Sequence, residues 1–214
     1  GYANLGALLM CEGLPYDSAE GRAYAAAITA LMSGEAYLQS ARIAGALGPF
    51  PSYHLNQEPM LEVVEMHRGA AHRLPTRGIP AELRQEAARA WDEAHEVGRQ
   101  VGFRNAQVTV LAPTGTIGFM MDCDTTGIEP DLALLKLKRL VGGGTLRIVN
   151  QSVTEALIRL GYDEPSRTTI LKHLNESGTI EGAPALADAH LPVFDCAFRP
   201  VNGTRFISSL GHLR

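Results

Sequence analysis

Apolar side chains recur at steps of three, four or seven residues along the first half of the chain, which is the period of an amphipathic helix. This pattern predicts four helices, over residues 3–12, 17–46, from 56 onward and 80–101. Asp17 followed by Glu20 resembles a capping box for the second helix, Asn56 is a candidate cap for the third, and Pro80 suits the first turn of the fourth. The apolar stripe of the fourth helix comprises Leu83, Ala87, Trp91, Ala94 and Val101.

The pattern changes after Gly102. Alternating or β-branched runs predict strands over 106–111 and 132–138, and a short edge strand over 191–195. Gly142–Gly144 is expected to be a loop, and helices are expected from about 149 to Gly161 and over 165–176. Helices alternating with separate strands favour an α/β fold in one segment, 1–214, with 1–102 mainly helical and 103–214 mixed.

Composition narrows the class of protein. The chain has 214 residues, 45% hydrophobic and 20% charged, with a formal net charge of −4. A nucleic-acid-binding protein normally presents a basic face, so the charge argues against one. No apolar run of about 18 residues predicts a membrane span, and the N-terminus lacks a signal-peptide pattern. The three cysteines, Cys11, Cys123 and Cys196, have no CxxC spacing, which suits a reducing compartment. We expect a cytoplasmic protein.

The stretch LAPTGTIG, residues 111–118, joins the predicted strand 106–111 to a short helix that is expected over 117–121. Backbone N–H groups at a helix start, beside the hydroxyls of Thr114 and Thr116, suit a phosphate group, and Gly115 would let the ligand approach closely. The stretch is neither a Walker loop nor GxGxxG. It can equally be a strand-to-helix corner that needs one glycine. From the residues alone both interpretations stay open.

The next stretch, DCDTTGIEPD (122–131), imitates a calcium loop at Asp122, Asp124, Thr126 and Gly127. The position that requires a bidentate Glu is Ala133, so calcium is rejected. The acids are then either helix-cap and turn residues or the polar rim of a substrate pocket. The histidines have no partner at metal-ligand spacing. The cluster of Lys136, Lys138 and Arg139 suits either contact with a phosphate or cofactor or a solvated strand face, and the strand alternation favours the solvated face.

Several of these stretches together resemble the catalytic subunit of adenosylcobalamin-dependent, class II ribonucleotide reductases. The longest is APTGTIGFMMDCDTTGIEPDLALLKLKRLVGGG (112–144). Others are GYANLGALLM at 1–10, GLPYDSAEGRA at 13–23, NQSVTEALIRLGY at 150–162, HLPVFDCAF at 190–198 and GHLR at 211–214. The resemblance runs along essentially the whole chain, in order.

The resemblance implies part of a ten-stranded α/β barrel and a vitamin B12-dependent ribonucleoside-diphosphate reductase. In that family adenosylcobalamin generates a thiyl radical on a cysteine. The radical takes the 3′-hydrogen of the ribose, the 2′-hydroxyl leaves as water, and a cysteine pair supplies two electrons, renewed by a thioredoxin-like donor. The Pro-Thr-Gly-Thr turn corresponds to the loop that holds the ribonucleotide substrate's phosphates. The implied contacts are Thr114, Gly115, Thr116 and Ile117, with Ala112 and Pro113 shaping the turn.

The chain also departs from the family pattern. The radical cysteine of the family lies in an Asn-Pro-Cys-Gly-Glu-like motif, which is absent here, and Cys11 follows Met10 instead. None of the three cysteines matches the radical cysteine, the reducing pair or the C-terminal pair. We therefore expect an internal piece that depends on the remaining parts of the same polypeptide and is inactive alone. The alternatives are a non-catalytic nucleotide-binding module and a purely structural segment.

Overall fold

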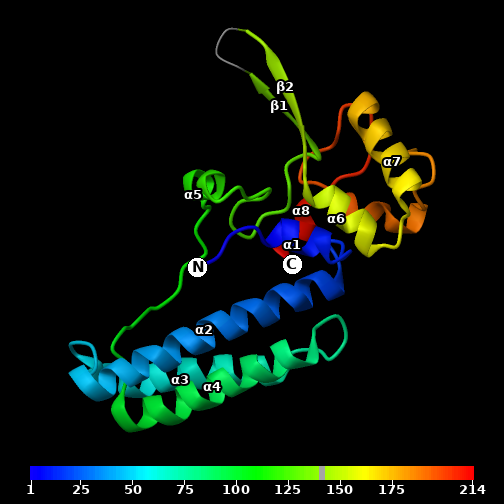
Figure 1. Ribbon diagram of the computed structural model, residues 1–214. Helices are drawn as coiled ribbons and strands as arrows, with labels where there is room; N and C mark the ends of the chain where they lie inside the picture. Colours follow the sequence, from blue (N-terminus) through cyan, green and yellow to red (C-terminus); the bar gives the residue numbers. More distant parts are fainter. Residues whose placement is uncertain (140–142) are drawn as a thin grey trace. The chain divides into compact units, whose positions relative to one another are not determined.

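The computed structural model describes residues 1–139 and 143–214, and the chain divides into two compact units (Figure 1). The helical unit comprises Gly1 and Arg22–Val110, and the mixed unit comprises Tyr2–Gly21 and Leu111–Arg214. Among the described residues, no helix combines the length and apolar character needed to cross a membrane.

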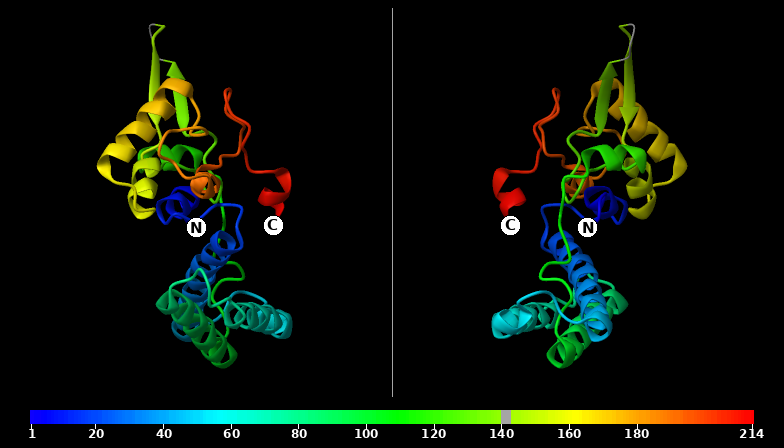
Figure 2. Two further views of the ribbon diagram at one scale, coloured as in Figure 1. Left: turned by 90° about the vertical axis from the view of Figure 1, so that its right-hand side faces the viewer. Right: turned by 90° about the vertical axis from the view of Figure 1, so that its left-hand side faces the viewer.

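Three long helices form the helical unit: α2 (Ala19–Leu47, whose first residues belong to the mixed unit), α3 (Tyr53–His72) and α4 (Ala81–Val101). Helices α3 and α4 lie side by side (Figures 1 and 2). The expected stripe of α4 is confirmed at its centre, where Ala87, Trp91 and Ala94 are buried. The core contains Tyr37, Leu38, Ala41, Tyr53, Val64, Ala71, Trp91, Ala94 and Phe103.

Two predicted helix starts are wrong in detail. The side chain of Ser18, rather than Asp17, accepts the Gly21 N–H (2.9 Å) at the start of α2. Helix α3 begins at Tyr53, ahead of Asn56, whose side-chain amide donates back to the Ser52 carbonyl (3.0 Å). The cap of α2 is therefore one position later than predicted, and α3 begins before its predicted cap.

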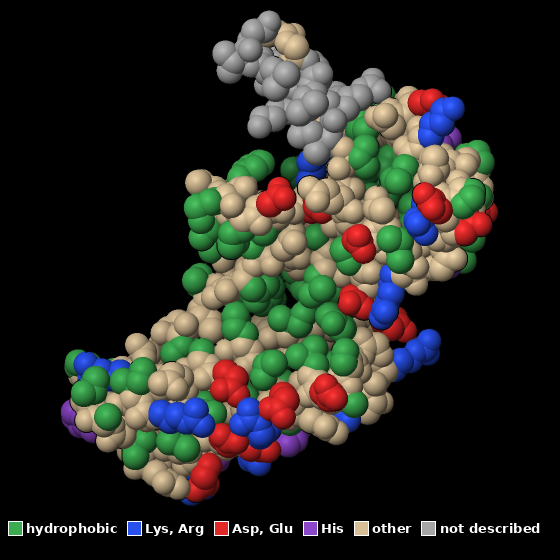
Figure 3. Space-filling view, viewed as in Figure 1, with side chains coloured by type: hydrophobic (Ala, Val, Ile, Leu, Met, Phe, Trp, Pro, Cys, Tyr) green, Lys and Arg blue, Asp and Glu red, His purple; other side chains and the backbone are tan. Residues whose placement is uncertain are grey.

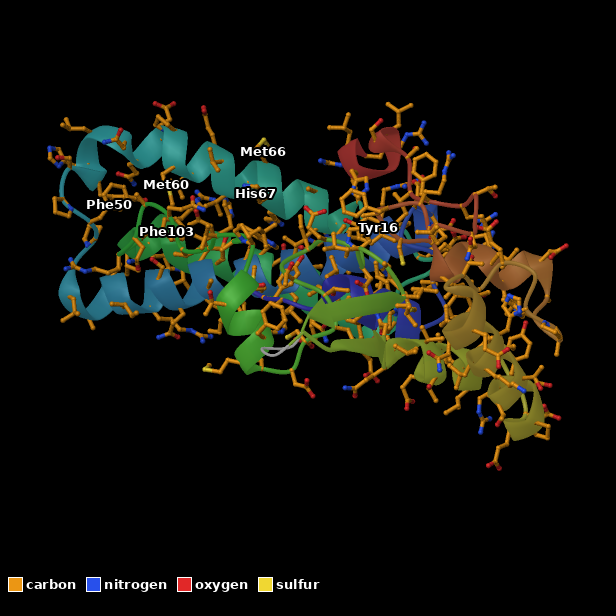
Figure 4. The ribbon with its side chains drawn as sticks, turned by 90° about the horizontal axis from the view of Figure 1, so that it is seen from above. Tyr16, Phe50, Met60, Met66, His67 and Phe103 are labelled. Atoms are coloured by element: carbon orange, nitrogen blue, oxygen red, sulfur yellow. The ribbon has the colours of Figure 1, made fainter. Side chains whose placement is uncertain are left out.

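The chain after α4 returns to the start of α3. Phe50 N–H donates to the Phe103 carbonyl (2.9 Å), and both rings lie in this part of the unit (Figure 4). Phe103 is fully buried and its ring occupies the space above Gly98, where a Cβ would clash with it. His67 stacks on Trp91 with ring centroids 5.1 Å apart. Aromatic packing therefore closes this core.

The mixed unit is built from short elements. Its helices are α1 (Leu5–Cys11), α5 (Gly115–Met120), α6 (Ser152–Arg159), α7 (Glu164–Ser177), the 3₁₀-helix η1 (Asp188–Phe194) and α8 (Ser209–Leu213). Strands β1 (Leu135–Arg139) and β2 (Thr145–Val149) form an antiparallel pair. Leu135 lies opposite Val149, and Arg139 opposite Thr145. A core of aliphatic residues from α6, α7 and η1, with Met10 of α1, holds these elements together.

The strand predictions have mixed outcomes. Strand β1 confirms the second predicted strand with a later start, whereas β2 was missed and Val149 ends it rather than beginning a helix. Of the expected glycine loop, Gly143 and Gly144 lie between the strands, and Gly142 is outside the described residues. Residues 106–111 form no strand and 191–195 fall largely in η1. An extended run becomes a strand only against a neighbouring strand, and β1 and β2 are the only pair within 1–139 and 143–214. This part of the chain does not display the expected barrel.

The later helix predictions are largely confirmed. Helix α7 covers the expected 165–176, with Asp163 accepting the Ser166 N–H (3.0 Å) and Pro165 in its first turn. Helix α6 buries Val153 and Ala156, and the chain turns at Gly161, where φ is +87°.

Candidate functional site

The Pro-Thr-Gly-Thr turn leads directly into α5. Thr114 is the residue before the helix, and its carbonyl accepts the first helical bond from Gly118 N–H (2.7 Å). The amides of Gly115, Thr116 and Ile117 therefore have no acceptor within α5. A Cβ placed on Gly115 would meet no heavy atom within 4 Å. The predicted turn thus presents three backbone donors beside open space.

The Thr125–Gly127 stretch locks this turn in place. Gly127 N–H donates to the Thr114 hydroxyl oxygen (2.7 Å). Gly127 has a positive φ of +53°, and a Cβ there would lie 2.8 Å from the Ala112 carbonyl oxygen. The methyl group of Thr126 packs against Gly118. Position 127 therefore needs glycine for both its backbone conformation and its close approach to the turn.

The start of α1 holds the same stretch from a second direction. The Asn4 side-chain carbonyl accepts the Thr125 N–H (3.0 Å), and the buried Thr125 hydroxyl accepts the Ala7 N–H (3.1 Å). These contacts join residues more than 115 positions apart in the sequence, since Ala7 and Thr125 are separated by 118 positions. The sequence offered no signal for them.

Backbone strain gathers at this place. Asn4, Thr114 and Asp122 all have positive φ, at 68°, 55° and 56°. They are three of the five non-glycine residues with positive φ in the described part of the chain. Such conformations cost about 1–3 kcal/mol each and persist where the surroundings enforce them, often at functional sites. Two loops, the Pro-Thr-Gly-Thr turn and the Thr125–Gly127 stretch that holds it, are therefore the strongest candidate site.

A polar network continues from Asp124. Its carboxylate accepts hydrogen bonds from the Ser152 N–H (3.0 Å) and the Ser152 hydroxyl (2.6 Å), at the start of α6. The helix-cap interpretation of this acid is thus the one the structure bears out. Lys136 donates to the Asp124 carbonyl (2.7 Å) and pairs with the buried Asp131 (2.9 Å). Lys136 is therefore tied into the network and does not simply face solvent, as the alternation suggested.

Comparison with known proteins shows the family of the chain. The family model described as "Ribonucleotide reductase, barrel domain" matches residues 1–210. The chain belongs to this family. The resemblance inferred from the sequence is thereby confirmed.

The chain is also similar to three curated relatives, each named vitamin B12-dependent ribonucleotide reductase. It is 54% identical to one from Rhodopirellula baltica over 213 residues, which cover 100% of this chain and 20% of the relative. It is 49% identical to one from Streptomyces avermitilis over 217 residues (100% and 22%), and 50% identical to one from Agrobacterium fabrum over 201 residues (87% and 16%). The chain spans about a fifth of the length of these relatives.

The cysteines of this ribonucleotide reductase segment are unpaired thiols. Cys11 and Cys123 are partly exposed, and Cys196 is buried. Burial raises the pKa of Cys11, which also has a hydrogen bond with Ser152, and burial raises the pKa of Cys196 much further. Both thiols therefore stay protonated at neutral pH, the opposite of the activated thiolate expected of a nucleophilic cysteine.

A partly open cavity lies elsewhere in the mixed unit. It has a volume of about 330 Å³, between β1, the end of α7 and residues 194–205. Arg205 forms a two-point ion pair with Asp195 on its wall (2.8 and 2.7 Å), and Glu181 accepts the Arg205 N–H (2.8 Å). No sequence signal indicated this cavity, because its wall comes from separate segments. Among the described residues no group of three His, Cys, Asp or Glu side chains is placed to hold a metal ion.

An apolar surface lies beside the Pro-Thr-Gly-Thr turn. Phe119 is 85% exposed, and Met120, Met121, Ile117 and Leu111 are exposed beside it. Hydrophobic side chains gather on this part of the mixed unit in Figure 3. The apolar residues of α5 are thus not buried by the described residues of the unit.

Proposed function

We propose that this segment binds the phosphates of a ribonucleotide substrate in a vitamin B12-dependent ribonucleotide reductase. Thr114, Gly115, Thr116 and Ile117 are the proposed contacts, and Ala112 and Pro113 shape the turn. The observation that carries the proposal is the set of three free amides on a turn locked by Gly127. Sequence similarity to relatives named ribonucleotide reductase supports a ribonucleotide as the substrate.

The chemistry of the turn suits an anion. Backbone N–H groups at the start of a helix carry partial positive charge, and a phosphate oxygen accepts from them. The Thr114 hydroxyl already accepts from Gly127 N–H (2.7 Å), so its own hydrogen is free to be donated. The turn can therefore offer three N–H donors and one O–H donor to the same group. The absence of a side chain at Gly115 leaves the approach to these donors open.

The remaining chemistry belongs to the complete enzyme in this proposal. Bound adenosylcobalamin would supply the radical chemistry there, and other segments of the polypeptide would supply the radical and reducing cysteines and the contact with a thioredoxin-like donor. Cavities for drug-sized ligands usually measure about 300–1,000 Å³. The cavity of about 330 Å³ lies at the lower end of that range. We assign the apolar face of α5 to contact with these other segments.

The test is a titration of the chain with a nucleoside diphosphate, before and after Gly115→Val. Because a Cβ at this position meets open space, the valine should leave the fold intact and block the three amides. We expect the affinity to fall at least tenfold, a loss of about 1.4 kcal/mol or more. Gly45→Ala, where a Cβ would make only ordinary contacts (3.7 Å to Val101), is the control and should bind normally.

The outcomes separate the proposal from its alternatives. Binding that survives Gly115→Val contradicts the role of the turn. Binding lost in the variant, by a chain that produces no deoxynucleotide with cobalamin and a dithiol, supports a substrate-binding segment of a larger enzyme. Absence of binding by the unaltered chain favours the purely structural alternative.

A further inference from the structure

We propose that Asp124 is a positioning residue for the phosphate turn, acting through Thr125 and Gly127 on Thr114. This inference rests on the proposed function of the turn and goes beyond it, because Asp124 lies outside the residues assigned to the phosphates. Its basis is the way in which both the side chain and the backbone of Asp124 are held.

The carboxylate of Asp124 is fixed by three donors. One oxygen accepts from the N–H (3.0 Å) and the hydroxyl (2.6 Å) of Ser152, and the other accepts from the Gln151 N–H (3.4 Å). Hydrogen bonds to a charged acceptor are about twice as strong as those between neutral groups. The residue that precedes α6, Gln151, provides no side-chain cap of its own. The start of α6 is therefore capped by Asp124, from a loop 28 positions earlier in the sequence, together with the Asn150 side-chain oxygen, which also accepts the Ser152 N–H (2.7 Å).

The backbone of Asp124 is fixed independently. Its carbonyl accepts from the Lys136 ammonium group (2.7 Å), which also pairs with Asp131 (2.9 Å). The Asp131 side chain is only 1% exposed and accepts a second hydrogen bond from the Asn150 side-chain amide. Asn150 N–H in turn donates to the Leu134 carbonyl (2.9 Å). Asp124 is thus connected to the well-packed part of the mixed unit through both of its polar ends.

Gly127, which holds the turn, lies only three positions after this anchor. Thr125 is held by Asn4 and Ala7, and Gly127 N–H donates to the Thr114 hydroxyl. Thr114 has a left-handed backbone conformation (φ 55°, ψ 27°) that a β-branched residue rarely adopts. Loss of the anchor at Asp124 would let Gly127 move and release Thr114 from this conformation. The three amides that follow Thr114 would then lose their common direction.

The chain contains a matched control for this idea. Asp163 also caps a helix, but the helix is its own: its carboxylate accepts the Ser166 N–H (3.0 Å) at the start of α7, three residues later in the sequence. Removing either carboxylate should weaken one helix start and lower the melting temperature slightly. Only the loss of Asp124 should also disturb the phosphate turn.

The test uses a complete reductase that carries this segment, with steady-state kinetics on its ribonucleotide. We expect Asp124→Ala to raise KM about tenfold with kcat within about twofold, as for a loss of binding shared by substrate and transition state. Asp163→Ala should leave KM unchanged. Asp124→Asn keeps one acceptor oxygen and should restore part of the affinity. Ser152→Ala removes a single hydrogen bond to Asp124 and should raise KM about threefold, close to the value of one such bond.

Each outcome decides between explanations. An unchanged KM in Asp124→Ala, together with a raised KM in Gly115→Val, overturns the positioning role and leaves the proposed function standing. An unchanged KM in both variants overturns the proposed function itself. Equal changes in Asp124→Ala and Asp163→Ala show a general structural effect and overturn the inference. Where Asp124→Ala does not fold, an unchanged KM in both Asp124→Asn and Ser152→Ala overturns it as well.

Discussion

The two units of the chain bury different kinds of groups. The core of the helical unit is aromatic and aliphatic, and Ser40 is its only buried polar residue among the described positions. The mixed unit buries five polar or charged residues in its described part: Thr125, Asp131, Asn150, Ser152 and Thr179. All of them except Thr179 belong to the polar network that ends at the Pro-Thr-Gly-Thr turn.

This difference shows how each unit is specified. Helices with a continuous apolar stripe can pack by area alone, at about 25 cal/mol per Å² of apolar surface removed from water. Buried polar groups are stable only when each finds its own partner, so they define one geometry rather than a range of similar ones. The helical unit therefore relies on packing, and the mixed unit relies on directed hydrogen bonds where the candidate site lies.

The largest expected effect removes packing from the helical unit. Phe103→Ala deletes a fully buried ring that contacts Tyr37 and Tyr53 (centroids 5.8 and 6.5 Å). We expect the free energy of unfolding of this unit to fall by about 3–5 kcal/mol. Chemical denaturation followed by the fluorescence of Trp91 measures it. Phe119→Ala is the control, because this ring is 85% exposed and its loss should change stability by less than about 0.5 kcal/mol.

A smaller effect is expected where the loops interlock. Gly127→Ala combines an unfavourable positive φ with a close approach of 2.8 Å to the Ala112 carbonyl oxygen. The expected cost is about 2–4 kcal/mol, with weaker nucleotide binding. Gly178→Ala has a positive φ of +78° with open space around the Cβ, and should cost about 1 kcal/mol without any change in binding. Equal costs in the two variants, measured by thermal denaturation, would contradict the close packing of the loops.

The smallest expected effect concerns a group that the candidate site does not use. Cys196 is 5% exposed, and burial raises its pKa above the ordinary value of 9.0. A raised pKa means that the folded state favours the protonated thiol. This stability is fully present below pH 9 and is lost as the pH rises above it. Cys196→Ala should therefore flatten the alkaline arm of the stability curve, and native Cys196 should resist thiol reagents at pH 8. Rapid labelling of native Cys196 would show that the mixed unit is loosely packed.

The sequence was informative where structure is local. The periodicity of α4 and the helix expected over 165–176 involve residues within a few helical turns, so their patterns are visible in the sequence. A short helix after Pro113 was likewise expected from the turn residues, although α5 begins at Gly115, two residues before the predicted start. Such features depend on propensity and on apolar spacing, which a single sequence records.

The remaining features depend on distant partners. Thr125 contacts Asn4 and Ala7, which lie near the N-terminus, and Asp124 caps a helix that begins 28 residues later. The run 106–111 has strand-like residues but no strand beside it in the described part of the chain. Residues 191–195 contain Pro192, which η1 accommodates within its turn instead of at a sheet edge. Periodicity carries no information on any of these pairings.

The most direct test of the phosphate site follows the backbone amides themselves. Two-dimensional ¹⁵N–¹H NMR spectra of the chain would be recorded during titration with a nucleoside diphosphate. We predict that the amide signals of Gly115, Thr116 and Ile117 shift first and furthest, with Gly127 following, while those of α3 and α4 remain in place. Shifts that gather at the cavity between β1 and the end of α7, with the amides of the turn unmoved, would contradict the assignment of the phosphate site.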